Sequence, residues 1–404
     1  MKIGRVLPPA AAPISVPNVL NGLVGLFQPK RELLRFSDEL KKHFDVKHCF
    51  LVSSGKAALY CILKALHAIH PEKNEVLLPA FTCYCVASAV VRAGLKVRLC
   101  DIDSQTLDFD SVALAKELEN SERLLCVVPT HLFGLHAQVE TLRFLAKRKD
   151  FAVVEDAAQV MGGSENNAKL GLLGDVGFYS LARGKALSTC EGGIIVTNDD
   201  KIGAHVGVVV KTLPQYGLPD RAMLFFKACI IAVFSRPSLF WIPKSLPFLG
   251  LGGTYFDSDF SILSLSGFQA GMSRGWNKKL ECLRRQRNKN IQRLASFFKV
   301  NTLSRCFSFA NNTPVPEDLL RFPVRMDSEE LCAETIRQSD RAGLGITITY
   351  PLPLCDLPEL AGTVSGDYPA AKASSGRILT LPIHPFVNDK DAESIIKLLL
   401  KIVS

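Results

Sequence analysis

The chain has 404 residues, 48% of them hydrophobic and 22% charged, and a formal net charge of +9. Its length allows a large domain together with a smaller one, and its composition is that of a globular protein rather than a disordered or fibrous one. The Lys and Arg residues are mostly scattered, so we interpret the charge chiefly as a source of solubility and expect no nucleic-acid partner.

The 12 cysteines follow no regular spacing. Cys83 and Cys85 are too close for a CxxC metal knuckle and no paired Cys/His cluster follows, so no metal site is predicted. Others, such as Cys100 and Cys126, sit in apolar runs, where a reduced thiol behaves as a small hydrophobe. Because the sequence shows no signal peptide, we expect a reduced protein in the cytoplasm.

Between residues 50 and 200, short apolar runs alternate with amphipathic stretches. The expected strands are Cys49–Val52, Glu75–Pro79, Val97–Asp101, Leu124–Pro129, Ala152–Glu155 and Gly193–Thr197. The expected helices are Lys56–His67, Asp110–Glu119 and Val139–Lys147. This alternation predicts an α/β sandwich around a mostly parallel sheet, whose strands are buried on both faces.

Two helices are expected in the C-terminal third: a charged one at Trp276–Phe298 and an amphipathic one at Asp389–Ile402. We predict a first domain over residues 1–265, which combines an N-terminal segment with the large α/β domain. Residues 266–404 would form a linker helix and a small C-terminal domain.

Residues 223–253 form an unusually apolar segment. Lys227, Arg236, Pro237 and Pro243 interrupt it, whereas a transmembrane helix needs about 20 uninterrupted apolar residues. We favour a helical insertion that is buried or packed at a subunit interface. The alternative is a surface for peripheral membrane contact.

An apolar strand that ends at Asp156 is followed, further along the chain, by Lys185. A strand-end carboxylate can pair with a ring nitrogen and a lysine can form a Schiff base with an aldehyde, which are the groups that a pyridoxal phosphate (PLP) enzyme needs. The structural alternatives are a helix-capping Asp and a solvated Lys near a turn. Gln159, Ser180 and the Glu191–Gly193 run before a strand favour the catalytic interpretation, because they could hold the ring oxygen, the phosphate and the lysine in place.

Ser54, Gly55 and Lys56 lie in a turn between a strand and a helix. Backbone N–H groups in such a turn can face a phosphate at the positive end of the helix dipole. The alternative is an ordinary Ser cap. Lys56 and Lys169 compete with Lys185 for the role of the reactive amine, but neither has its flanking pattern.

Two histidines are weaker candidates for substrate contacts. His131 follows an apolar strand and either lines the active site or is a hydrogen-bonded core histidine. His384 lies in the late Leu-Pro-Ile-His-Pro run, where a structural role is favoured.

In their order and spacing, these motifs resemble the DegT/DnrJ/EryC1/StrS family of PLP-dependent sugar aminotransferases. The resemblance runs from near residue 30 to the C-terminus. It is carried by Ser53–Ala58, Leu78–Thr82, Asp101–Asp103, His131–Gly134, Glu155–Gln159, Gly174–Ser180, Lys185, Glu191–Gly193, Gln269–Ala270 and Leu379–Pro385.

The resemblance implies a PLP-dependent transferase of fold type I, like aspartate aminotransferase, with a large, mostly parallel sheet domain and a small α+β C-terminal domain. It implies a cytoplasmic homodimer with active sites at the subunit interface. The reaction would move an amino group, usually from glutamate, to a keto group of a nucleotide-linked sugar in amino-sugar or surface-polysaccharide biosynthesis.

By position in the family pattern, Lys185 would be the Schiff-base lysine and proton carrier. Asp156 would pair with the pyridine nitrogen and Gln159 with the ring hydroxyl. The phosphate would bind Ser180 and the turn formed by Ser54, Gly55 and the Lys56 backbone.

The chain departs from the family at three places. Lys56 stands where relatives usually have Thr. Cys83 stands where an aromatic residue usually stacks on the ring, and Phe81 or Tyr84 are the substitutes. Ile262–Leu265 replaces an Asn-x-Arg-Met motif whose Asn reaches the neighbouring subunit's phosphate.

Two alternative functions stay open. One is a non-catalytic or regulatory PLP-binding protein. The other is an aminotransferase that acts on a non-sugar or lipid-linked ketone at the membrane surface.

Overall fold

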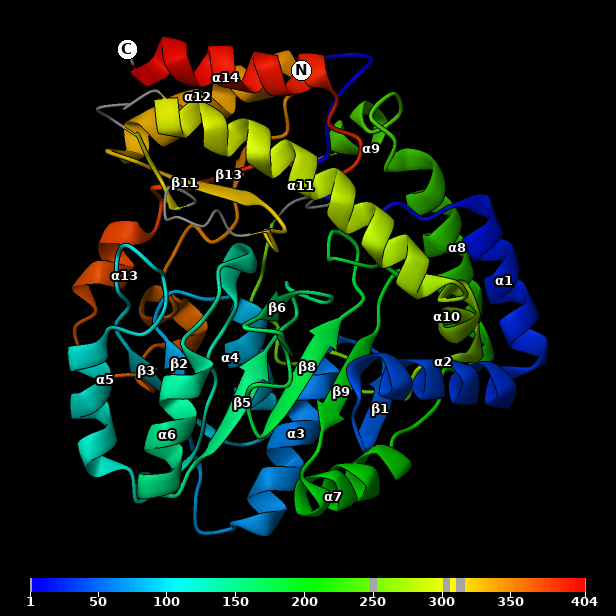
Figure 1. Cartoon of the computed structure of the whole chain (residues 1–404), viewed down its shortest axis with the longest axis vertical. Coiled ribbons are helices and arrows are strands. Elements are labelled where there is room, and N and C mark those ends of the chain that lie inside the picture. The colour runs from blue at the N-terminus through cyan, green and yellow to red at the C-terminus, as the bar shows by residue number, and fades with distance from the viewer. Residues whose placement is uncertain (1, 247–252, 301–305, 310–316, 404) are drawn as a thin grey trace.

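The structure is a computed structural model that describes residues 2–246, 253–300, 306–309 and 317–403 (Figure 1). Its larger part is built on a seven-stranded sheet. The strands, in spatial order, are β1 (His48–Val52), β9 (Gly193–Thr197), β8 (Val176–Ser180), β5 (Ala152–Asp156), β4 (Leu124–Val127), β2 (Glu75–Pro79) and β3 (Lys96–Cys100). β9 runs antiparallel to both of its neighbours, and the other paired strands are parallel. The predicted fold class is confirmed.

Helices cover both faces of this sheet, because alternate residues of its strands are apolar on both sides. In β2, Val76 and Leu78 pack into one core cluster and Leu77 into the other. The first cluster is covered by α3 (Gly55–Ile69), α4 (Tyr84–Arg92) and α7 (Asp200–Lys211). The second is covered by α2 (Pro29–Phe44), α5 (Ser111–Glu117) and α6 (Val139–Lys149).

Most predicted strands match the observed ones to within a residue or two, and Glu75–Pro79 and Gly193–Thr197 match at both ends. The strand predicted to Pro129 ends at Val127, since proline has no N–H for the ladder. β8 is missing from the predicted strands, because its polar and glycine residues interrupt the apolar pattern.

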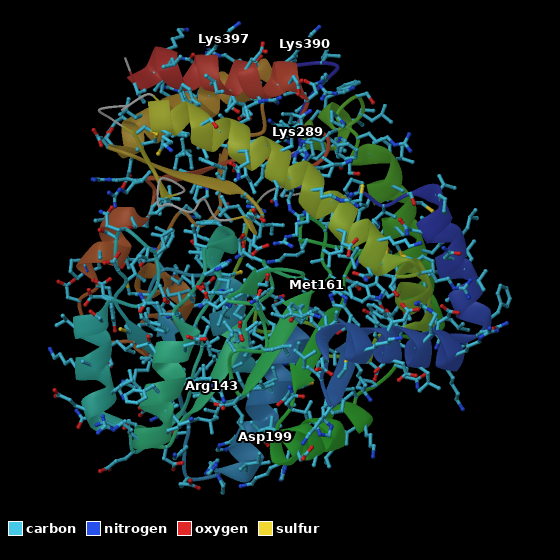
Figure 2. All side chains as sticks on the ribbon, in the orientation of Figure 1. Arg143, Met161, Asp199, Lys289, Lys390 and Lys397 are labelled. Atoms are coloured by element: carbon cyan, nitrogen blue, oxygen red, sulfur yellow. The ribbon has the colours of Figure 1, made fainter. Side chains whose placement is uncertain are left out.

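A four-stranded antiparallel sheet lies in the C-terminal part of the chain, in the order β10 (Cys306–Ser308), β11 (Phe322–Met326), β13 (Ile378–Leu381) and β12 (Thr347–Ile348). Three helices accompany it: α11 (Trp276–Val300), α12 (Glu329–Ala342) and α14 (Asp389–Val403). Lys289 of α11 and Lys390 and Lys397 of α14 are exposed on the outer side of these helices (Figure 2). Smaller elements are α13 (Pro369–Ser374), β6 (Ser164–Glu165) and β7 (Ala168–Lys169).

The N-terminal residues are bound to this C-terminal part. The Leu7 N–H donates to the Gly343 carbonyl (2.9 Å), and Arg5 forms an ion pair with Asp391 (2.5 Å). The Val6 N–H donates to the Pro237 carbonyl (2.8 Å). The predicted domain boundary after residue 265 stays a prediction.

Three further helices form a unit beside the main sheet: α1 (Val16–Phe27), α8 (Leu218–Phe234) and α10 (Gly267–Met272), with the short α9 (Trp241–Lys244) after α8. α1 and α10 touch through their backbones, because a Cβ on Gly25 would lie 2.0 Å from the Gly267 carbonyl oxygen. A separate apolar cluster that includes Val19, Leu224 and Phe268 joins the three helices.

The apolar segment that begins at residue 223 is only partly buried. α8 buries Leu224, Ala228 and Ala232 and leaves its opposite side exposed. Within one chain α8 is therefore not a fully buried insertion, because one helix side suffices to anchor it; the alternative of packing at a subunit interface stays a prediction. Residues 247–252 lie outside the described residues. Within the described part of the chain, no helix has the length and apolar character needed to cross a bilayer.

Because α1 and α10 are in backbone contact, adding a single methyl group at Gly25 should destabilise the protein. We expect Gly25→Ala to lower the free energy of unfolding by about 1–3 kcal/mol, because the added Cβ overlaps the Gly267 backbone. Gly207→Ala in α7 is the control, since its Cβ would meet Phe50 at an ordinary 3.4 Å. That variant should be neutral or more stable by about 0.5–1 kcal/mol. Urea unfolding measures both, and equal stabilities would contradict the close packing.

Candidate active site

The parallel strands end at one edge of the seven-stranded sheet, and Figure 1 shows the arrowheads of β5 and β8 pointing toward the half of the molecule with the four-stranded sheet. Asp156 ends β5, Ser180 ends β8, and Ser54 follows β1. The fold thus brings residues from three distant parts of the chain to the edge where α/β proteins bind ligands.

Asp156 is buried, with 4% of its surface exposed. The Ala158 N–H donates to its Oδ1 (3.0 Å). Burial raises the pKa of this carboxyl above its ordinary value, and the positive charge of Lys185 opposes the shift. A carboxylate in this setting gains from a cationic partner, as a protonated pyridine nitrogen would be.

Lys185 lies in the loop between the antiparallel strands β8 and β9. Three backbone hydrogen bonds close this loop: the Leu181 N–H donates to Gly192 (2.8 Å), the Arg183 N–H to Cys190 (3.1 Å) and the Thr189 N–H to Leu181 (3.0 Å). Gly184 supplies a positive φ of 76° directly before the lysine. Among the described residues, the Lys185 amine has no hydrogen-bond or ion-pair partner, so its amine is free to react.

The two competing lysines are engaged elsewhere. Lys56 Nζ donates to Asp257 (2.7 Å) and lies 4.5 Å from the centre of the Phe260 ring. Lys169 lies over the Phe44 ring at 5.5 Å. The extra charge that Lys56 brings to the turn is therefore paired with a carboxylate.

The Ser54–Lys56 turn lies against the end of β8. A Cβ on Gly55 would be 3.1 Å from Ser180 Cβ and 3.3 Å from Ser180 Oγ. Ser54 caps α3, because its Oγ accepts a hydrogen bond from the Ala57 N–H (3.1 Å). The cap and the phosphate interpretations of this turn are thus compatible: the Ser180 hydroxyl faces the N-terminal turn of α3, where unbonded N–H groups favour an anion.

Cys83 lies within electrostatic range of both Lys185 and Asp156. A hydrogen bond with the Cys85 side chain lowers the pKa of the Cys83 thiol. Burial and the charge of Asp156 raise the pKa of this thiol, and the positive charge of Lys185 lowers it further. The thiol therefore occupies the neighbourhood in which the stacking group was expected.

Phe81 and Tyr84, the proposed aromatic substitutes, pack against Tyr350. Their ring centroids lie 6.0 and 5.9 Å from that of Tyr350, and both side chains are buried. The Tyr84 hydroxyl also bonds the backbone of Leu352 (2.9 Å). Both rings thus connect the main sheet to the segment around Tyr350.

Gln159 is buried, and its Oε1 accepts a hydrogen bond from the Phe133 N–H (3.2 Å). Its amide nitrogen has no partner among the described residues. That nitrogen is a donor that could serve the ring oxygen of PLP.

His131 is fully buried and both of its ring nitrogens are occupied. Nε2 lies 2.8 Å from Glu155 Oε1, and Nδ1 accepts a hydrogen bond from the Ala137 N–H (3.0 Å). The geometry favours the core-histidine interpretation over a substrate contact.

His384 is buried as well. Its Nε2 is 2.8 Å from the Pro8 carbonyl, and burial lowers the pKa of the imidazole to about 4. It anchors the N-terminal residues, so a substrate contact through its ring nitrogens is not supported.

The sequence analysis missed Arg321, the residue before β11. Its side chain is half-buried, its Nη1 donates to Thr349 Oγ1 (2.7 Å), and its buried Nε has no partner among the described residues. Burial lowers its pKa, and the nearby Tyr350 and Cys83 raise it. No local motif marks this residue, because its relation to Cys83 arises only from the packing of the two sheets.

PLP fits the residues present here. The arrangement offers a buried carboxylate for a ring nitrogen, a free amine for an aldehyde, and a hydroxyl beside a helix N-terminus for a phosphate. These groups belong to the class of PLP-binding enzymes on an α/β scaffold.

The sequence pattern of the DegT/DnrJ/EryC1/StrS aminotransferase family matches residues 24–230 and 257–400. The chain belongs to this family, which confirms the resemblance. Aminotransferases of the family are PLP-dependent.

Individual relatives agree with this assignment. GDP-perosamine synthase of Caulobacter vibrioides is 32% identical over 176 residues, 44% of this chain and 46% of that protein. A pleiotropic regulatory protein of Geobacillus stearothermophilus is 34% identical over 164 residues, 40% of this chain and 43% of that protein. The chain thus matches less than half the length of each.

Among solved structures, Helicobacter pylori PseC, an aminotransferase involved in the biosynthesis of pseudoaminic acid, covers 98% of this chain and 99% of its own. Its TM-score is 0.78 at 16% identity, so this likeness concerns the fold.

Because burial raises the pKa of Asp156, the carboxyl group that would bind PLP should reduce the stability of the PLP-free protein. Because the folded-state pKa of this carboxyl is raised above the unfolded value, the native protein loses stability as pH rises from the ordinary range of an Asp carboxyl through the folded pKa. We expect Asp156→Asn, whose amide oxygen can still accept the Ala158 bond, to raise the melting temperature of the PLP-free protein at pH 7.

Asp318 is the matched control. Burial alone would raise its pKa, but hydrogen bonding to His136 and the charge of Arg284 outweigh burial and lower it. Asp318→Asn should therefore reduce stability at pH 7, by about 1–3 kcal/mol. Thermal melts at pH 5 and 7 measure both variants, and destabilisation by Asp156→Asn would contradict the analysis.

Proposed function

We propose that this chain is a PLP-dependent aminotransferase that transfers an amino group to the keto group of a nucleotide-linked sugar. The carrying observation is that Asp156, the free Lys185 amine and the Ser180–Gly55 contact meet at one edge of the sheet. Family membership supports the reaction class, and the relative named GDP-perosamine synthase supports the sugar.

When bound, PLP supplies a ring that takes up the electron pair released at the substrate carbon. Asp156 would hold the proton on the pyridine nitrogen. The Gln159 amide nitrogen would donate to the ring oxygen. The Ser180 hydroxyl and the N–H groups of Gly55 and Lys56 would bind the phosphate. Lys185 would carry the proton between substrate atoms through its Nζ.

The donor's carboxylate would bind Arg321. A half-buried guanidinium with a buried, unbonded Nε and no carboxylate partner among the described residues favours an anionic ligand. Arg321 and Lys185 both act electrostatically on the Cys83 thiol, which supports a ligand carboxylate on the same side as the reactive amine.

We further propose that the protein is a homodimer and works in the cytoplasm. The family resemblance supports the dimer. The 12 free cysteines support a reducing environment.

A regulatory PLP-binding protein is the second candidate, and the match to a pleiotropic regulatory protein favours it. The retained Lys185 and Asp156 are the observations against it, because a protein that only binds PLP needs no proton-transfer group.

The proposal predicts a visible absorption band when the purified protein is mixed with PLP. Glutamate should bleach this band, and borohydride reduction should leave the cofactor attached to Lys185, as peptide mass analysis would show. Lys185→Ala should lose this attachment and at least about 10³-fold in rate. Glutamine is the second donor to test.

Lys169→Ala is the matched control, because that lysine lies over Phe44 and should leave the band unchanged. A wild-type band that no amino donor bleaches would support the regulatory candidate instead. Failure to bind PLP would reject both.

The role of Arg321 is tested by separating binding from turnover. We expect Arg321→Met to raise the KM for the amino donor by about 10- to 100-fold, with a smaller change in kcat, because it removes a charge-assisted contact to the carboxylate. Arg321→Lys should recover part of the affinity. Thr349→Val, which removes the hydrogen bonds to Arg321 and to Thr380 but keeps the guanidinium, should have a smaller effect. An unchanged KM in Arg321→Met would exclude the assignment while leaving the aminotransferase proposal intact.

A further inference from the structure

α1 and α8, which contact each other, each expose a row of apolar side chains; together we call these rows the apolar face. On each helix the exposed residues recur every three or four positions, so they lie on one side of it. Phe27 is 86% exposed and Phe226 is 60% exposed. The apolar face consists of Val16, Leu20, Val24 and Phe27 of α1 and Met223, Phe226, Ile230 and Val233 of α8.

The apolar face is built on a firm support. α1 is held against α10 through the Gly25–Gly267 contact, and α8 inserts Leu224, Ala228 and Ala232 into the cluster beneath it. α1 and α8 also contact each other. Figure 1 shows the two helices along the same edge of the molecule, away from α5 and α6.

The charges around the apolar face are mostly positive. α1 contains no charged residue, and Lys30 and Arg31 lie in the first turn of α2, three and four residues after Phe27. The exposed Asp220, in the first turn of α8, is an acidic exception. Lys227 and Arg236 are exposed on and just after α8. Lys30, Arg31 and Arg236 have no carboxylate partner in the described part of the chain. An apolar centre with a basic margin matches the acyl boundary and the anionic headgroups of a bilayer.

A cavity of about 440 Å³ lies between α8 and the turn before α3 that belongs to the candidate active site. Met223 and Lys227 of α8 line it together with Ser54, Lys56 and Tyr216. Contact between the apolar face and a surface would therefore bring the turn beside Ser180 close to that surface.

We propose that the apolar face binds peripherally to an anionic lipid bilayer, with α1 and α8 parallel to the membrane plane. The side chains around Phe27 and Phe226 enter the headgroup boundary, and Lys30, Arg31 and Arg236 contact lipid phosphates. This docking does not depend on the catalytic activity proposed above.

Vesicle flotation of the full-length protein tests the proposal. The protein should float with vesicles of phosphatidylcholine and phosphatidylglycerol at 3:1, and less with phosphatidylcholine alone or at high salt, which screens the basic margin. The variant Phe27→Glu/Phe226→Glu should reduce the bound fraction by at least about tenfold, because both side chains would carry charge into the boundary.

Phe144→Glu is the matched control. Phe144 is 62% exposed on α6, outside the apolar face, so the same substitution should leave flotation unchanged. Circular dichroism and thermal melting establish that all three proteins are folded.

Three results would overturn the proposal. The wild-type protein does not float with anionic vesicles, or the Phe144→Glu control loses flotation as fully as the double variant. In the third, the wild-type protein does not bind vesicles and light scattering shows that it is a dimer, whereas the double variant is a monomer. The apolar face would then be covered by a second copy of the chain. Wild-type flotation that only the double variant loses supports it.

Discussion

The site depends on how two adjacent carboxylates at the end of β5 are satisfied. Glu155 is fully buried and bonded on all sides: Oε1 contacts His131 and the Gly171 N–H, and Oε2 accepts from the Leu173 and Gly174 N–H groups. It therefore fixes the loop after β4 and the loop before β8 to the central strand. Asp156, the next residue along the strand, accepts from one N–H in the described contacts and is left for a ligand. One carboxylate thus organises the scaffold and the other is available for chemistry.

Local patterns were enough to predict the large sheet, since its strands are short apolar runs buried on both faces. They also led to the prediction of Asp156 and Lys185 as site residues, because a strand end and a glycine-rich loop have local signatures. The contact of Gly55 with Ser180 could be expected only through the family resemblance, since it depends on the order of β1, β9 and β8 in space. Arg321 could not be predicted from the sequence, because its proximity to Cys83 and Tyr350 arises only when the two sheets pack together. His131 has the local appearance of a site residue, yet Glu155 binds it.

The three-helix unit shows a different limit of sequence reasoning. Composition alone marks α8 as apolar, but it does not say which side is covered. Leu224, Ala228 and Ala232 are small or of medium size and face inward, so the helix packs closely and its larger side chains remain outside. The glycines of α1 and α10 allow the same close approach on the other flank. The stability of this unit therefore comes from close backbone approach and small-residue packing together with the buried Phe268 of α10.

The bonds of the N-terminal residues have a mechanical consequence. Val6 is tied to Pro237, just beyond α8, and the neighbouring Leu7 is tied to Gly343, at the end of α12. These residues act as a short strap between the helical unit and the C-terminal sheet. A hinge motion that moves the C-terminal sheet over the site has to break this strap or transmit the rotation to α8. Unless these hydrogen bonds break, any closure of the C-terminal sheet over the site would therefore change the orientation of α8.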